Sequence, residues 1–67
     1  MDYGEVLALT KLVCRKLKKN RTEGTIADEL ETEPKIIQQI CEIAKAYAPD
    51  YNVEEIAREY SERVGHV

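Results

Sequence analysis

The chain has 67 residues, a net charge of −3, and 43% apolar and 34% charged residues. This composition is too apolar for a disordered tail, and the length allows one small domain that buries only about 60% of the surface exposed by its unfolded chain. We therefore expect a single small domain over residues 1–67 that must either pack idealised helices well or cover its remaining apolar surface with a partner.

Membrane segments and cysteine-based sites are not indicated. The longest purely apolar run near the N-terminus, Val6 to Leu9, is far shorter than the roughly 20 residues of a membrane span or the roughly 7–15 of a signal-peptide core. A cytoplasmic protein without membrane contact is the expectation. Cys14 and Cys41 form no Cys-x-x-Cys pair, so neither a zinc site nor a redox motif is suggested, and we expect no cofactor.

The first helix is predicted over residues 3–19. Its apolar residues recur at steps of three and four, which is typical of an amphipathic helix. They are Val6, Leu9, Val13 and Leu17, with Leu12 beside them. Lys11, Arg15 and Lys18 fall on a neighbouring polar stripe, and the lysines near the end complement the helix dipole.

The second helix is predicted over residues 23–31. Thr22 can cap it, although Thr25 followed by Asp28 offers a competing capping box. The helical period places the apolar residues on an inner face and the acidic residues outside. The inner residues are Ile26, Ala27 and Leu30, and the outer residues are Asp28, Glu29 and Glu31.

The third helix is predicted over residues 33–48. Thr32 is a suitable cap, and Pro34 is tolerated in the first turn because its missing N–H would have no partner there. Pro49 disfavours helical geometry at Ala48 and ends the helix. The apolar residues cover a wide arc, so this helix is expected at the centre of the core. They are Ile36, Ile37, Ile40, Ile43, Ala44 and Tyr47.

A fourth helix is predicted over residues 53–64. Asn52 followed by Glu55 is another capping arrangement, and Gly65 is expected to close the helix. The predicted fold class is therefore all-α, a small four-helix bundle with a helix-turn-helix-like centre.

The second and third helices fit the apolar spacing of a helix-turn-helix. The positions that this unit requires are filled by Ile26, Ala27, Leu30, Ile37 and Ile40. At the turn the unit commonly has glycine, because that backbone position adopts a positive φ, and this chain has Glu31 instead. A non-standard turn is expected.

Five basic residues crowd the end of the first helix, namely Arg15, Lys16, Lys18, Lys19 and Arg21. Such a cluster can neutralise DNA phosphates, and three residues of the third helix, Lys35, Gln38 and Gln39, have side chains that can reach base edges. However, Glu31 and Glu33 would then approach phosphates. We favour a packing or partner-binding unit, through a homodimer or another protein, and keep helix-turn-helix-like DNA binding as the alternative.

Catalytic residues are not assembled by this sequence. Glu33-Pro34-Lys35 and Pro49-Asp50 match the two halves of a metal-binding nuclease motif, but in reversed order and without the strands on which that motif depends. His66 is the single histidine, so no histidine-centred base or triad can form. We expect no enzyme and no metal site.

The run LVCRKLKKNRTEGTIADELETEPKIIQQICEIAKAYAPDYNVEEI, residues 12–56, resembles the C-terminal helical region of bacterial Rpn or PD-(D/E)XK nuclease-family transposase proteins. The resemblance is carried by LVCRKL with its basic turn, IADELE, ICE and YAPDY. It implies an excised tail or a short stand-alone equivalent, which binds the nuclease domain, self-associates, or helps to seat the enzyme on DNA. The family's catalytic acids and lysine have no counterpart here.

Overall fold

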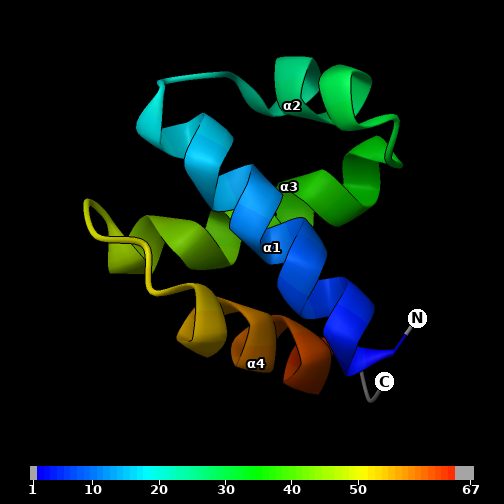
Figure 1. Ribbon diagram of the computed structural model, residues 1–67, viewed down its shortest axis with the longest axis vertical. Coiled ribbons are helices and arrows are strands. Elements are labelled where there is room, and N and C mark those ends of the chain that lie inside the picture. Colours follow the sequence, from blue (N-terminus) through cyan, green and yellow to red (C-terminus); the bar gives the residue numbers. More distant parts are fainter. Residues whose placement is uncertain (1, 65–67) are drawn as a thin grey trace.

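The computed structural model describes residues 2–64, which form four α-helices and no strand. The helices are α1 (Tyr3–Lys18), α2 (Glu23–Leu30), α3 (Pro34–Ala44) and α4 (Val53–Arg63), with a short 3₁₀ turn, η1 (Lys45–Tyr47), after α3 (Figure 1). The predicted all-α class with four helices is thereby confirmed. Gly65, expected to close the last helix, and His66 lie outside the described residues.

Helix α3 lies at the centre of the molecule. In Figure 1 it crosses behind α1, with α2 beside its N-terminal end and α4 on the other side. Its packing partners are α1, α2 and α4, while α1 also packs along α4. Every helix contributes to the core, and α3 contributes the most buried residues. Those of α3 are Ile37, Ile40, Cys41, Ile43 and Ala44. The expected central position of this helix is confirmed.

Side-chain caps determine where three helices begin. Oγ1 of Thr22 accepts a hydrogen bond from the backbone N–H of Thr25 at 3.2 Å, so Thr22 is the cap of α2 and the competing start is wrong. Oδ1 of Asn52 accepts from the N–H of Glu55 at 3.1 Å, as predicted. Asp2 caps α1 in the same way, which the sequence analysis did not identify. Each cap satisfies an N–H that has no partner inside its helix.

The two ends of α3 differ from the prediction. Glu33, not Thr32, is the N-cap, and its side chain makes no capping hydrogen bond. The Thr32 hydroxyl instead donates to the carbonyl oxygen of Leu30 at 3.2 Å. The α-helix ends at Ala44 and tightens into η1, and Ala48 is extended, as expected of a residue before proline.

The turn between α2 and α3 corrects the expectation of non-standard geometry. Glu31 adopts the left-handed conformation, with φ 53° and ψ 42°. The N–H of Thr32 donates to the carbonyl oxygen of Ala27 at 3.0 Å, the bond typical of a Schellman end. The hydrogen bonds of the helix end therefore accompany a glutamate in a conformation that costs an L-residue roughly 1–2 kcal/mol.

Thr10 of α1 is a fully buried polar residue in the core. Its Oγ1 has no hydrogen-bond partner among residues 2–64. Thr10 stands four residues after Val6 and three before Val13, both fully buried, so it belongs to the inner stripe of α1. The Thr10 hydroxyl therefore loses its hydrogen bonds to water on folding and gains none in the protein, which lowers the stability of the fold.

We expect Thr10→Val to stabilise the domain by about 1 kcal/mol, because a methyl group of similar size replaces an unpartnered hydroxyl. Urea unfolding followed by circular dichroism measures the change. Thr10→Ser keeps the hydroxyl and removes the methyl group, so it is the control and is expected to be less stable than the native chain. A clear loss of stability in Thr10→Val would contradict this account of the core.

Candidate interaction surface

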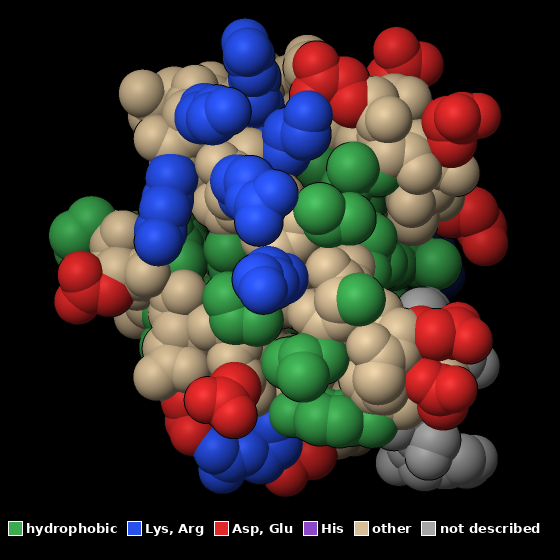
Figure 2. All heavy atoms as spheres, in the orientation of Figure 1, with side chains coloured by type: hydrophobic (Ala, Val, Ile, Leu, Met, Phe, Trp, Pro, Cys, Tyr) green, Lys and Arg blue, Asp and Glu red, His purple; other side chains and the backbone are tan. Residues whose placement is uncertain are grey.

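The five predicted basic residues form one exposed surface, which we call the basic patch: Arg15, Lys16, Lys18, Lys19 and Arg21. All are exposed except Lys16, which is half-buried. The chain turns at Asn20, where φ is 62°, and the N–H of Arg21 donates to the carbonyl oxygen of Lys16 at 3.2 Å. This turn folds Arg21 back against the last turn of α1. Figure 2 shows the resulting group of basic side chains over the C-terminal half of α1.

A group of acidic residues lies beside the patch on the same face. We call it the acidic edge, and it consists of Asp28, Glu29, Glu31 and Glu33 from α2 and the following turn, all exposed. In Figure 2 acidic side chains lie on the α2 side of the face that carries the basic patch. Surfaces of opposite charge are thus neighbours in one small domain.

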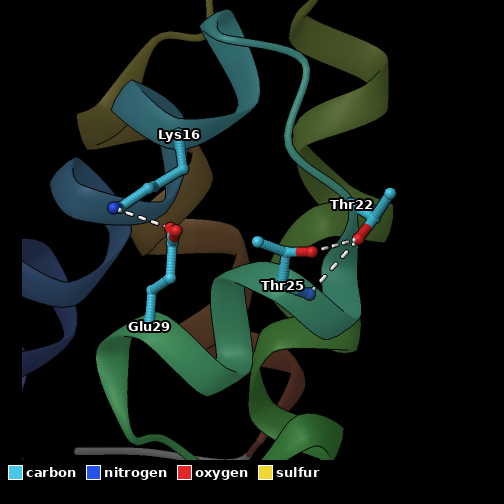
Figure 3. Close-up of polar contacts among 4 residues, drawn as sticks. All are labelled: Lys16, Thr22, Thr25 and Glu29. Carbon is cyan, nitrogen blue, oxygen red and sulfur yellow. Dashed lines mark hydrogen bonds and ion pairs between the residues drawn. The ribbon is translucent and has the colours of Figure 1, made fainter.

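One ion pair joins the two surfaces. Nζ of Lys16 lies 2.8 Å from Oε1 of Glu29, across the space between α1 and α2 (Figure 3). The hydrogen bond from Lys16 lowers the pKa of Glu29, and the charges of Lys16, Arg21 and Lys19 act in the same direction. Among residues 2–64, the other four basic-patch residues make no ion pair. Most of the patch therefore keeps its charge available.

A shallow open groove lies between α2 and the start of α3, with a volume of about 380 Å³. It is lined by Gly24, Ala27, Asp28, Glu31, Thr32 and Pro34. Two of the acidic-edge carboxylates, Asp28 and Glu31, therefore border a hollow with apolar walls. The helical spacing of Gly24, Asp28 and Glu31 places this groove on a different side of α2 from Glu29, which faces α1.

The three residues predicted to read bases are not brought to the basic patch. Lys35 and Gln38 are exposed on α3 and Gln39 is half-buried. In Figure 1 the N-terminal end of α3 and the C-terminal end of α1 lie at opposite sides of the molecule. Glu31 and Glu33 stand immediately before α3, as expected from the sequence. The two parts of the predicted DNA-contacting surface are thus separated.

Leu12 is an apolar residue of this face that sequence reasoning placed beside the buried stripe. It is 41% exposed on the outer side of α1, where Ala8 and Arg15 are exposed one turn to either side. Hydrophobic side chains accordingly appear next to the basic ones in Figure 2. Single exposed apolar side chains are common on protein surfaces, so Leu12 marks no site by itself.

The two cysteines belong to the core and are free thiols. Burial raises the pKa of Cys14, and burial together with nearby Glu23 raises the pKa of Cys41 to about 11. Both thiols are therefore almost entirely uncharged near neutral pH, and a thiol reacts as its thiolate. Within the described residues, no group of three or more His, Cys, Asp or Glu side chains is placed to hold a metal ion.

No family model, curated protein or solved structure matches the chain. The resemblance to the helical region of Rpn-type proteins therefore stays a prediction from the residues that carry it. Among the helices of residues 2–64, none has the length and apolar character needed to span a bilayer.

The lowered pKa of Glu29 predicts a pH dependence of stability. Its ordinary value is 4.5, so the ion pair with Lys16 stabilises the fold fully above that pH and loses this effect as the pH falls through the lower folded-state pKa. We expect Glu29→Gln to be less stable than the native chain at pH 7, and we expect this difference to shrink as the pH falls below 4.5. Urea unfolding at pH 7, 5 and 3 measures this, with Glu62→Gln on α4 as the control. A stability difference that does not change with pH would contradict the prediction.

Proposed function

We propose that this chain is a non-catalytic helical module that acts by protein association. The observation that carries the proposal is the shared face of α1 and α2, where the exposed basic patch lies beside the acidic edge (Figure 2). Opposite charges on neighbouring surfaces steer association and select partners by complementarity. The Lys16–Glu29 pair neutralises only a small part of this face.

The apolar surface of α1 supports the same proposal. Leu12 is 41% exposed on α1, and the exposed basic residues Arg15 and Lys19 are near it along the helix. A domain of this size retains much of its apolar surface after folding, and covering that surface is a common source of further stability. A partner that covers Leu12 gains hydrophobic burial while the surrounding charges set its orientation.

Two partners are proposed, a second copy of the chain and a Rpn-type nuclease domain. The second follows from the resemblance of residues 12–56, because such a helical tail accompanies a larger nuclease domain in that family. The module would then assemble or regulate the nuclease without supplying catalytic residues, in the cytoplasm.

We expect Leu12→Gln to weaken association by about tenfold or more, since the burial of one leucine contributes about 1.5–3 kcal/mol. Sedimentation velocity measures self-association at high micromolar concentration and binding of the nuclease domain. Val64→Gln changes another exposed apolar residue, 42% exposed at the end of α4, and is the matched control. A chain that stays monomeric and also ignores the nuclease domain would refute the proposed function.

Duplex DNA binding is the second candidate, and the exposure of the basic patch is the observation that favours it. The acidic edge beside the patch opposes it, because Glu31 and Glu33 precede the helix that would approach the duplex. Lys35, Gln38 and Gln39 of α3 would supply any base contacts.

For this candidate, we expect that replacing Lys18, Lys19 and Arg21 with alanine removes duplex binding and lowers the salt dependence by about one unit per lost phosphate contact. Fluorescence anisotropy with a labelled random duplex at about 50 and 200 mM salt measures both effects. Lys45→Ala, outside the patch, is the control. An unchanged affinity in the triple variant would exclude binding through the patch.

A further inference from the structure

We infer that the groove between α2 and α3 is the docking site for the basic patch of a second copy of this chain. The two copies are related by a twofold axis that passes between their antiparallel α2 helices. The inference rests on the proposed function and names its partner and its contact. In a twofold dimer the same two surfaces meet twice, so each groove receives a basic side chain from the other copy.

The lining of the groove suits a long basic side chain. Ala27 and Pro34 offer apolar walls, and a Cβ atom placed on Gly24 would have no neighbour within 4 Å. The carboxylates of Asp28 and Glu31 border this apolar hollow. Lysine and arginine have an apolar stem and a charged end, so the stem can pack on the walls while the end pairs with a carboxylate. The groove is open and near the lower limit of ligand-pocket volumes, which favours a side chain over an enclosed small molecule.

The charge layout along α2 identifies a second copy as the occupant. Basic residues precede the N-terminal end of α2, the last of them Arg21, and the carboxylates of Asp28 and Glu31 mark its C-terminal end. If two copies pack with their α2 helices antiparallel, each basic segment lies beside the acidic end of the other helix. The opposed helix dipoles favour the same arrangement. Gly24 has no side chain, which lets the neighbouring copy approach closely.

The contacts within one copy do not use the charged groups that this dimer would pair. Glu29 forms an ion pair with Lys16 on the side of α2 that faces α1 (Figure 3). Asp28 and Glu31 line the groove on another side, and within residues 2–64 neither makes an ion pair. Arg21 is exposed and is likewise without an ion pair in this part of the chain. The carboxylates of Asp28 and Glu31 and the guanidinium of Arg21 are thus all available to a second copy.

A charge-swap experiment tests the docking. One variant carries Asp28→Lys and Glu31→Lys, and the other carries Lys19→Glu and Arg21→Glu. Each variant alone places like charges at both contacts, so we expect its dissociation constant for self-association to rise at least tenfold. An equimolar mixture of the two variants restores opposite charges at both contacts, so we expect it to form a heterodimer. Sedimentation equilibrium measures all three samples, and circular dichroism checks their folding. Glu54→Lys with Glu62→Lys, on the exposed side of α4, is the matched control that should associate as the native chain does.

A second variant blocks the groove without reversing a charge. Gly24→Gln fills open space with a better helix former, so we expect equal or greater thermal stability together with loss of self-association. Self-association that survives in Gly24→Gln, or variants that do not recover on mixing, would overturn the docking. A chain that binds the nuclease domain but never self-associates would overturn the docking while leaving the proposed function intact. A chain that does neither refutes both.

Discussion

The burial of α3 by three neighbouring helices is the constraint on which the rest of this structure depends. Ile37, Ile40 and Ala44 are fully buried, and Cys41 and Ile43 are nearly so. Apolar residues spread over so wide an arc cannot be covered from one side, so α1, α2 and α4 each pack against this helix. In turn, α2 uses its short apolar face on α3, while Asp28 and Glu31 stay exposed on its outer side. The groove and the acidic edge follow from that arrangement.

Two left-handed residues give the exposed surface its charge layout. Asn20 ends the turn after α1 and Glu31 ends α2, with φ values of 62° and 53°. Between them α2 has only eight residues, a length of about 12 Å at 1.5 Å per residue. The basic segment therefore stands at one end of a short helix and the acidic turn at the other. This separation of charge opposes phosphate binding over the whole face, yet it suits a self-complementary contact.

The helices could be predicted from the sequence because apolar periodicity and capping residues act locally. The pattern of Ile36, Ile37 and Ile40 was sufficient to place α3 at the centre, and the caps Thr22 and Asn52 mark their helices correctly. The errors lie in the turn between α2 and α3, where the helix-end hydrogen bonds of Thr32 replace the expected cap. Glu31 adopts a conformation that glycine would favour, and Glu33 rather than Thr32 precedes α3. The position of the turn was predictable, but its geometry was not.

The basic patch was equally predictable, because its five members are close in sequence and polar residues of a helix end remain exposed. The groove could not be found in this way. Its lining combines residues of α2 with Thr32 and Pro34, and their separation depends on how α2 sits on α3. The sequence placed Leu12 beside the buried stripe of the first helix, and it is exposed. Thr10 was assigned no position from the sequence, and it is fully buried between Val6 and Val13 on the inner stripe of α1.

The central claim, that α2 and the basic patch together form the association surface, is tested most directly by a dilution series of two-dimensional amide NMR spectra. The account predicts that resonances of Gly24, Asp28 and Glu31 shift together with those of Lys19 and Arg21, and that all follow one dissociation constant. Shifts confined to the exposed side of α4, or spectra that do not change from high to low micromolar concentration, would contradict it.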